Sequence, residues 1–533
     1  MIREITLHTN QFFSREEAEV KRIISRKLGI DEVRITDCLL TRRSVDARRG
    51  RLQVLHKYRV FIDEKAEITN GYLFDWRQSK PDRRVVILGS GPAGLFAALR
   101  LLESGIQPVV IERGPDVGTR RKDLAALSRA QLVNPNSNYC FGEGGAGTFS
   151  DGKLYTRSRK RGDVQRILAL LVHFGAPRQI LWDAHPHIGS DLLGGVVERM
   201  RNTIISYGGE FHFNTLADGI VLDRYGCAAG IRCTNGEINS GNAVLLATGH
   251  SAREVYSWAA HAGAVLEAKT FAVGVRVEHP KNLIDTIQYN GLPPGDLGAA
   301  SYRLSMQVRQ RGVYSFCMCP GGVVVPSASG PEQIVVNGMS PSARNTRWSN
   351  AAVVVEIRPE DFTSVFPDIF AAQGTLQEGS AQAALAVQQK FERLAWQHGD
   401  RQKAPAQRLV DFLDGRLSPS LPASSYTPGL VSSRLDLWLP EFTAGRLREA
   451  FKAFDTRMKG FISEEALLIA VESRTSSPVR MLRSPETYEA AGLKRVFPAG
   501  EGAGYAGGIV SSAMDGENAA KALIKRIYGA GKE

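Results

Sequence analysis

Cysteine is scarce in this chain, with six among 533 residues, at positions 38, 140, 227, 233, 317 and 319. Such sparse usage excludes a disulfide-dependent scaffold and indicates a reducing compartment. Cys317 and Cys319 are the one close pair, but a structural zinc site needs wider spacing and two further ligands. We therefore predict no metal site. Two interpretations of the pair stay open: small buried residues, or a redox pair.

Long apolar runs are also lacking. No eighteen consecutive residues are apolar, so we predict no membrane-spanning helix and no membrane partner. The first residues, MIREITLHTNQFF, carry early charges and lack the apolar centre of a secretory signal. Together with the cysteine content, these absences predict a cytoplasmic protein.

Acidic residues are in the minority, and the net charge is +12 at pH 7. About half of the excess lies within residues 1–84, where five arginines fall between Arg42 and Arg51. Three interpretations remain open: a solvated basic face, an anionic small-molecule substrate, and a nucleic acid. Nucleic acid ranks below a small molecule. The sequence does not specify the oligomeric state.

A chain of this length exceeds the size at which one core stops growing, so several domains are expected. Residues 1–75 predict a small α+β domain of β-α-β-β order, with Ser14 capping its helix and a hairpin turn at 47–50. Residues 82–268 and 480–533 predict one nucleotide-binding domain of the α/β class. Residues 269–479 predict a mixed α+β substrate domain.

Two local expectations concern the first large domain. Residues 115–190 are rich in Gly, Asn and Ser and are expected to be an irregular, functional loop. Residues 209–249 are expected to form a β-meander that ends in Ala247, Thr248 and Gly249.

The strongest motif is VVILGSGPAG, residues 85–94. Four apolar residues lead into the glycines, an apolar helical run follows, and a second strand ends at Glu112. This strand–turn–helix–strand context predicts dinucleotide binding. Gly89 permits the tight turn, Gly91 lets the backbone approach a pyrophosphate, and Gly94 allows close packing of helix on strand. Glu112 is expected to accept hydrogen bonds from a ribose.

A second glycine-rich segment, RVFPAGEGAGYAGGIVSSAM, spans residues 495–514. One helix follows it and no later strand carries an acidic residue for a ribose, so a second nucleotide domain is not predicted. We expect the chain to return to the first domain, where two helix N-termini hold the two ends of one long cofactor. Backbone N–H groups there would face a flavin carbonyl, and Glu501 would bond ribityl hydroxyls.

Several side chains are candidates for chemistry beside a flavin. Lys153 closes the glycine-rich segment NYCFGEGGAGTFSDGKLY and is interpreted as a group that stabilises negative charge, or as a surface lysine. His250 is a general-acid candidate, as are His185 and His187. Arg474 and Arg480 are interpreted as an anion clamp or as structural ion pairs. The candidate catalytic residues are Lys153, His250, Cys317 and Cys319.

The segments VVILGSGPAG…ERG, AVLLATG and FPAGEGAGYAGG together resemble the FAD-binding signatures of glutathione-reductase-type flavoproteins. More narrowly, NYCFGEGGAGTFSDGKL, HPHIGSD, ATGHSAR, YSFCMCPGG and ESRTSSPVR resemble a family of uncharacterised FAD-dependent dehydrogenases, or NAD(P)/FAD-dependent oxidoreductases, of bacteria and plastids. The resemblance covers nearly the whole chain. It implies a Rossmann-like FAD-binding domain of three layers (ββα), built from discontinuous segments. One position departs from the wider superfamily: this chain has Glu501 where those flavoproteins usually have an Asp.

The resemblance implies non-covalent FAD. The expected contacts are Gly89, Gly91, Pro92, Ala93, Gly94, Glu112, Arg113, Gly145, Ala146, Ser150, Gly152, Lys153, Ala247, Thr248, Gly249, Gly500, Glu501, Gly504, Gly507, Gly508 and Ile509.

The leading functional hypothesis is an FAD-dependent oxidoreductase that transfers hydride to or from a small organic substrate. The electron donor or acceptor stays open: either NAD(P)H binds transiently at the flavin face, or another carrier replaces it. Two alternatives are kept: an RNA-modifying flavoprotein that uses the basic N-terminal module, and a non-catalytic flavin-bound assembly or sensor protein. The sequence specifies no substrate.

Overall fold

The structure is a computed structural model. It describes residues 1–9, 17–46, 52–65, 72–156, 161–371 and 376–529. The predicted cap Ser14, the turn at 47–50 and three of the clustered arginines lie outside the described residues.

The N-terminal segment folds around one small sheet. Its elements are β1 (Ile2–Thr9), α1 (Glu17–Leu28), the short helix Glu32–Arg34, β2 (Ile35–Asp46) and β3 (Gln53–Ile62). The strand order is β1-β3-β2 and both pairings are antiparallel. Alternate strand residues such as Ile5 and Val60 pack against Val20 and Ile24 of α1, which is the period-2 and period-3.6 pattern of an α+β core. The predicted β-α-β-β order is confirmed.

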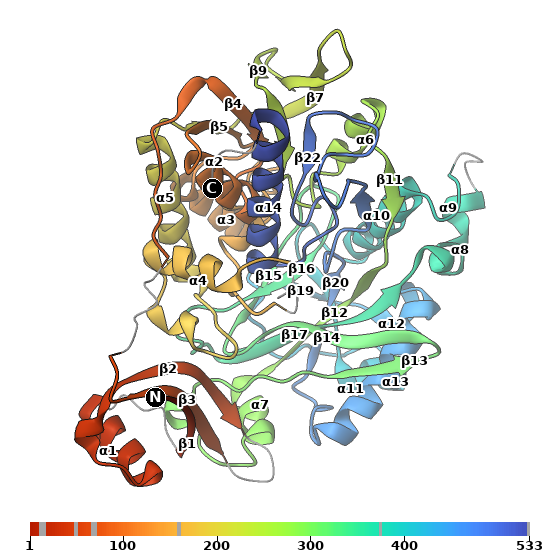
Figure 1. Cartoon of the computed structure of the whole chain (residues 1–533). Helices are drawn as coiled ribbons and strands as arrows, with labels where there is room; N and C mark the ends of the chain where they lie inside the picture. Colours follow the sequence, from red (N-terminus) through yellow and green to blue (C-terminus); the bar gives the residue numbers. More distant parts are fainter. Residues whose placement is uncertain (10–16, 47–51, 66–71, 157–160, 372–375, 530–533) are drawn as a thin grey trace.

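A five-stranded parallel sheet lies near the top of Figure 1. Its strands, in spatial order, are β22 (Val496–Pro498), β10 (Ala243–Leu246), β4 (Lys80–Leu88), β5 (Ile106–Ile111) and β6 (Glu210–His212). Leu88 is in register with Ile111 and Leu246, and Leu246 is in register with Pro498. The residues after these strands therefore meet at one edge of the sheet. The predicted return of the C-terminal segment to the first domain is confirmed.

Both faces of this sheet are covered, as parallel strands require. Val85, Ile87 and Leu245 face α2 (Pro92–Leu102), α5 (Ser190–Ser206) and α14 (Ile509–Tyr528). Val86 and Val244 face a three-stranded antiparallel sheet of β7 (Ala217–Leu222), β8 (Ala228–Cys233) and β9 (Ile238–Ser240). The layers are thus helices, parallel sheet and antiparallel sheet.

Two local expectations were wrong. The region 115–190 contains α3 (Val117–Ala130), α4 (Val164–His173) and the short helices Gly145–Gly147 and Arg178–Leu181. Asp116 and Asp163 cap α3 and α4 by accepting hydrogen bonds from backbone N–H groups, a start signal that we missed. The predicted meander is also divided: β6 and β10 join the parallel sheet, and β7–β9 alone form the antiparallel one.

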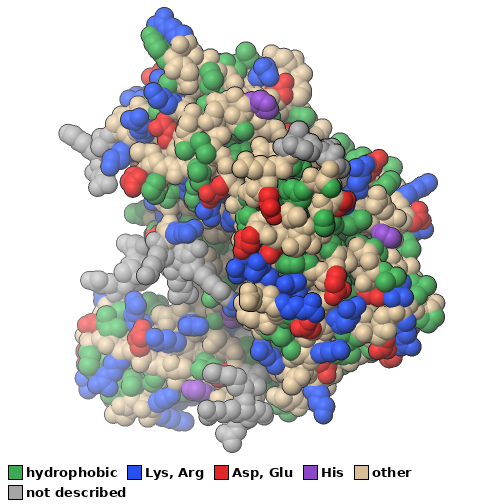
Figure 2. Space-filling model, turned by 90° about the vertical axis from the view of Figure 1, so that its right-hand side faces the viewer, with side chains coloured by type: hydrophobic (Ala, Val, Ile, Leu, Met, Phe, Trp, Pro, Cys, Tyr) green, Lys and Arg blue, Asp and Glu red, His purple; other side chains and the backbone are tan. Residues whose placement is uncertain are grey.

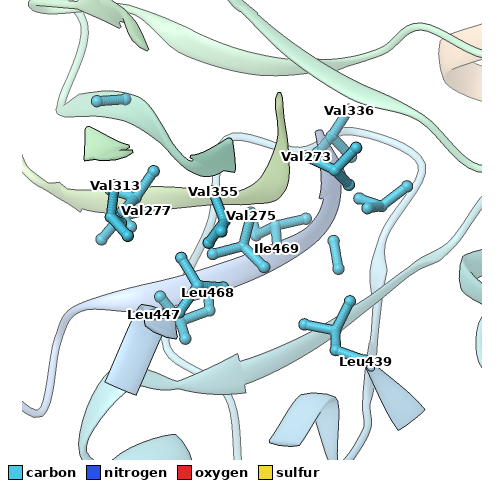
Figure 3. Packing of buried hydrophobic residues seen from close by; sticks show 14 of the residues in the cluster. Val273, Val275, Val277, Val313, Val336, Val355, Leu439, Leu447, Leu468 and Ile469 are labelled. Atoms are coloured by element: carbon cyan, nitrogen blue, oxygen red, sulfur yellow. The ribbon is translucent and has the colours of Figure 1, made fainter. Parts of the chain in front are cut away.

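The second large unit is built on a seven-stranded sheet of order β13-β14-β17-β12-β20-β18-β19. The strands are β12 (Phe271–Pro280), β13 (Ser305–Val308), β14 (Arg311–Cys319), β17 (Trp348–Ile357), β18 (Ala404–Arg408), β19 (Leu430–Ser432) and β20 (Leu467–Glu472). Two short pairs accompany it, β15 (Val323–Pro326) with β16 (Val336–Met339) and β11 (Leu266–Ala268) with β21 (Val479–Met481). Figure 3 shows Val273, Val275 and Val277 of β12 among side chains from neighbouring elements.

Helices complete this unit. They are α7 (Lys281–Gln288), α8 (Phe362–Val365), α9 (Pro367–Ala371), α10 (Ala381–Gln397), α11 (Leu409–Asp414), α12 (Leu435–Trp438) and α13 (Glu441–Arg457), with short helices at Gly295–Leu297 and Pro359–Asp361. Helix α6 (Arg253–His261) instead packs against the antiparallel sheet β7–β9, where Ala259 shares an apolar cluster with Ala217 and Val244. In the described part of the chain, no helix combines the length and apolar character needed to cross a bilayer.

Candidate functional site

The N-termini of α2 and α14 open onto one cavity of about 420 Å³. Gly91 and Gly508 are their N-caps, and no described side chain caps either helix. Unpaired N–H groups at a helix N-terminus, together with the helix dipole, form a ready site for anions. The two glycine-rich segments, far apart in sequence, therefore present two anion-binding ends to the same space.

A side chain would have different consequences at the different glycines of these turns. A Cβ at Gly94 would lie 2.0 Å from the Gly89 carbonyl oxygen, so α2 could not start so close to the sheet. A Cβ at Gly502 would lie 2.5 Å from the Gly249 carbonyl oxygen. A Cβ at Gly91 would meet no described heavy atom within 4 Å. Gly94 and Gly502 therefore serve packing, whereas Gly91 keeps space open at the cavity.

Most of the predicted contacts line the cavity. They are Gly89, Gly91, Pro92, Ala93, Glu112, Arg113, Gly145, Ala146, Ser150, Gly152, Lys153, Ala247, Thr248, Gly249, Glu501, Gly507, Gly508 and Ile509, and the candidates His250, Cys317 and Arg474 line it too. Gly94, Gly500, Gly504 and Cys319 are outside its described wall. Gly500 and Gly504 have φ of 77° and 83°, so they shape the turn rather than face the cavity.

Glu112 is buried and already engaged. Its carboxylate accepts hydrogen bonds from the backbone N–H and the hydroxyl of Ser90 and from the N–H groups of Gly114 and Gly142. Glu112 thus ties the first glycine turn to the loop that contains Gly142. Its contact with a ribose stays a prediction.

One fully buried arginine determines the shape of that loop. The Arg120 guanidinium donates to four backbone carbonyls, those of Asn138, Tyr139, Gly142 and Glu143. Burial lowers the pKa of Arg120 to about 10. Charge-assisted bonds of this kind are stronger than neutral ones. Sequence analysis missed Arg120 because it placed the residue in an irregular segment.

Lys153 extends from this loop to two sulfurs. Its Nζ lies 3.5 Å from Cys317 Sγ, 3.6 Å from Cys319 Sγ and 3.6 Å from Asp151 Oδ2. Burial opposes the charged ammonium, but electrostatic interactions with Cys317, Cys319 and Asp151 raise the pKa of Lys153. Lys153 is therefore a cation at neutral pH.

The two thiols titrate as a pair. A hydrogen bond from the Cys319 thiol, with the charges of Lys153 and Arg276, lowers the pKa of Cys317 well below its ordinary value although burial opposes this. The same hydrogen bond and burial raise the pKa of Cys319. The surroundings therefore favour ionisation of Cys317 over that of Cys319.

A buried ion pair supports this corner of the cavity. Arg276 donates from Nε to Glu472 Oε2 over 2.7 Å and from Nη1 to the Cys317 carbonyl oxygen over 3.0 Å. Burial raises the pKa of Glu472 to about 7, although the charge of Arg276 opposes the shift.

We expect Glu472 to make folding depend on pH. Its pKa in the folded state lies above the ordinary 4.5, so its stabilising effect is complete below about pH 4.5 and is lost as the pH rises through about 7. The slope is at most about 1.4 kcal/mol per pH unit. Urea unfolding of wild type and Glu472→Gln across this range checks it. The difference in free energy of unfolding between wild type and Glu472→Gln should change in favour of the variant as the pH rises. The same pH dependence of this free energy in both proteins would contradict the assignment.

His250 is a buried side chain of the cavity wall whose ring nitrogens make no hydrogen bond to a described residue. It is 9% exposed, and among the described residues neither ring nitrogen has a hydrogen-bond partner. Its Nδ1 lies 3.4 Å from Glu501 Oε1. A buried polar group normally has a partner. A ligand in the cavity would supply one, so His250 fits the presence of a bound cofactor or substrate.

The surroundings of Arg474 are compatible with both predicted roles, an anion clamp and a structural ion pair. It lines the cavity, and its Nη1 lies 3.1 Å from Ser251 Oγ and 3.2 Å from Cys140 Sγ. It is also ion-paired with Glu392, as is Arg253.

The other arginine and the two histidines lie outside the described cavity wall. Arg480 pairs with Glu267, a structural ion pair. His187 contacts the Ser342 carbonyl oxygen and pairs through its backbone with Lys153. Burial lowers the pKa of His185 and of His187.

Sequence analysis did not single out several wall residues, some inside the quoted glycine-rich segments and others outside any motif. They include Tyr139, Phe149, Asp151, Tyr155, Thr215, Leu216, Ala217, Ser327, Asn337, Gly338, Thr475 and Ser512. Asn337 and Gly338 come from β16, which reaches the cavity through tertiary folding alone.

The N-terminal sheet contacts residues 182–184, which precede α5, through its strand β2. Arg43 forms an ion pair of 2.6 Å with Asp183, and its backbone bonds to Trp182 and Ala184. On the face in Figure 2, Lys and Arg side chains are mixed with Asp and Glu side chains. Arg43 thus joins the N-terminal sheet to the segment at residues 182–184, and nucleic-acid binding stays a prediction.

Three family models match the chain. An FAD binding domain matches residues 82–145, and the model described as "FAD-dependent protein, C-terminal domain-like" matches residues 270–475. A domain of unknown function matches residues 1–62. The cofactor of this protein is therefore FAD, and the protein is a flavin-dependent enzyme.

Solved flavoprotein structures show low similarity. The flavin-dependent brominase Bmp2 is 12% identical with a TM-score of 0.37, covering 84% of this chain and 79% of its own. CtdE in complex with FAD is 10% identical with a TM-score of 0.31, covering 84% and 89%.

One curated protein shows a much closer relationship. The "Uncharacterized protein" of Clostridium beijerinckii is 37% identical over 532 residues, which cover 95% of this chain and 96% of the relative. The chain therefore belongs to the same family as this clostridial protein, a family with FAD-binding and FAD-dependent C-terminal domains.

Proposed function

We propose that the protein is an FAD-dependent oxidoreductase that transfers hydride between non-covalent FAD and a small organic substrate. The observation that carries the proposal is the single cavity. It is lined by the two helix N-termini of the parallel-sheet unit and also by Lys153, Cys317 and Asn337. Cofactor and substrate can thus share one space, which hydride transfer requires.

The position of the two helix N-termini supports the proposed contacts. Gly91 and the N-terminus of α2 would hold the pyrophosphate of FAD, and Glu112 would lie near its ribose. Gly508 and the N-terminus of α14 would offer N–H groups to negative charge on the flavin. The bound FAD supplies the hydride chemistry, and the protein supplies binding, orientation and electrostatics. His250 lies at the cavity wall, where it is the proposed general acid.

Charge favours an anionic substrate. Lys153 is a cation at the cavity wall, and its contact with the carboxylate of Asp151 is long, at 3.6 Å. The proposed electron donor is NADH or NADPH, bound transiently. We also propose a cytoplasmic location, because all six cysteines lie in described segments and are free.

Anaerobic titration tests this function. We expect NADH or NADPH to bleach the flavin absorbance, and an added quinone to restore it over repeated cycles. A Lys153→Met variant should bind FAD but turn over an anionic substrate more slowly. Bound FAD that neither nicotinamide cofactor reduces would contradict the proposed donor, and failure to cycle would favour the sensor alternative.

A further inference from the structure

Two sulfurs share one ammonium at the wall of the cavity. Cys317 and Cys319 both lie within 3.6 Å of Lys153 Nζ. Cys317 is partly exposed and lines the cavity, whereas Cys319 is fully buried. One accessible sulfur and one protected sulfur are thus held beside the same cation.

The backbone of β14 brings these sulfurs together. In a regular strand, residues two apart are separated by about 6.6 Å along the strand. Here the register of β14 with β17 shifts between Phe316 and Cys319, and Cys317 has a φ of 45°. Cys319 Sγ consequently lies 3.3 Å from the Cys317 carbonyl oxygen. Such bulges redirect side chains next to active sites.

The electrostatic setting suits sulfur chemistry. Lys153 and Arg276 place two positive charges near Cys317, and Cys319 supplies a hydrogen-bond donor. A thiolate is the reactive form of cysteine, and nearby cations favour it. Cys140 also lines the cavity, but no second cysteine sulfur contacts it among the described residues.

We propose that Cys317 and Cys319 form a thiol–disulfide couple that exchanges two electrons with FAD. This inference rests on the proposed oxidoreductase function. In the oxidising direction, the Cys317 thiolate and the Cys319 thiol lose two electrons and one proton. One S–H bond breaks and one S–S bond forms, and both electrons and the proton pass to oxidised FAD.

The accessible sulfur determines the class of external partner. In the reduced couple the Cys317 thiolate attacks a small disulfide that enters the cavity, and one thiolate of that compound leaves. Cys319 then closes the internal S–S bond, and the second half of the compound leaves as a thiol after taking the Cys319 proton. Reduced FAD restores the couple by returning two electrons and one proton. Lys153 acts as a positioning residue for the thiolate.

Reductive titration of the holoprotein tests the couple without measuring turnover. The protein is oxidised with diamide, desalted and titrated with dithionite under argon. Wild type should take up four electrons per FAD, two for the cofactor and two for the couple. Cys317→Ser and Cys319→Ser should each take up two. Cys140→Ser, which alters another cysteine of the cavity, should keep four.

The outcomes separate the two proposals. Uptake of two electrons by wild type and by all variants would overturn the couple and leave the oxidoreductase proposal intact. A flavin that takes up no electrons would overturn the proposed function itself. After oxidation, the wild-type peptide with both cysteines should have lost two hydrogens in mass.

Alkylation of the reduced holoprotein provides a second test, which does not depend on the variants of either sulfur. Iodoacetamide should modify Cys317 at a pH well below that needed for Cys227, a distant cysteine used as an internal control. In Lys153→Met, the midpoint of the pH dependence of Cys317 alkylation should rise by at least about one pH unit. Equal profiles for Cys317 and Cys227 would overturn the thiolate assignment.

Discussion

Replacement of Gly91 by valine should abolish FAD binding while leaving the fold intact. A Cβ at this position meets no described atom within 4 Å, and the backbone φ of −71° suits any residue. The added side chain would instead occupy the space in which the cofactor pyrophosphate approaches the backbone. We expect the dissociation constant of FAD to rise at least about a hundredfold, or about 2.7 kcal/mol.

Flavin absorbance per chain and thermal unfolding of the apoprotein measure the two parts of this prediction. Gly195→Ala is the matched control. A Cβ at Gly195 would lie 3.4 Å from its nearest described neighbour, an Arg199 nitrogen, and the residue is outside the cavity wall. This control should retain FAD. Gly94→Ala should instead lower stability, because its Cβ would lie 2.0 Å from a backbone oxygen. Full FAD content in Gly91→Val would contradict the assigned pyrophosphate site.

Replacement of Glu392 by leucine should destabilise the protein by about 3–5 kcal/mol. Glu392 is fully buried and contacts Arg253 at 2.7 Å and Arg474 at 3.0 Å. These arginines hold the pKa of Glu392 well below its usual range although burial opposes ionisation. Without the carboxylate, two buried guanidinium groups lose the negative charge that balances them. Removal of one partner from a buried ion pair is strongly destabilising for this reason.

Urea unfolding measures this effect, and Glu449→Leu is the matched control. Glu449 pairs with Arg309 at the surface, where both side chains are about half exposed, so its loss should cost at most about 1 kcal/mol. Because Arg474 lines the cavity, Glu392→Leu should also weaken FAD or substrate retention. Equal stabilities for the two variants would show that the buried network contributes little.

Local patterns predicted the strands, turns and helix N-termini that line the cavity on the side of the parallel sheet. The turn at Gly89–Gly94, the strand ending at Glu112 and the return at residues 496–509 all follow from the spacing of glycines after apolar strands. These residues lie at one sheet edge because parallel strands end together, which sequence order alone can indicate. The cofactor could therefore be predicted.

The remaining wall could not be predicted in the same way. Asn337 and Gly338 reach the cavity from the second unit, and Arg120 acts through backbone carbonyls of a loop. Neither depends on a local period or a motif. The helices α3 and α4 were missed because abundant polar residues nearby outweighed the cap signals at Asp116 and Asp163. Cys317 was identified, but its contact with Lys153 depends on the bulge in β14.

Cofactor release measures the central claim most directly, namely that two glycine-rich segments hold one non-covalent FAD. Wild-type protein is denatured with acid, and the released chromophore is identified by mass and counted per chain. The structure predicts one FAD per chain, fully released without proteolysis, and reduced content in both Gly91→Val and Gly508→Val. Folded protein that binds no added FAD, or a flavin that stays attached to the chain, would contradict the account.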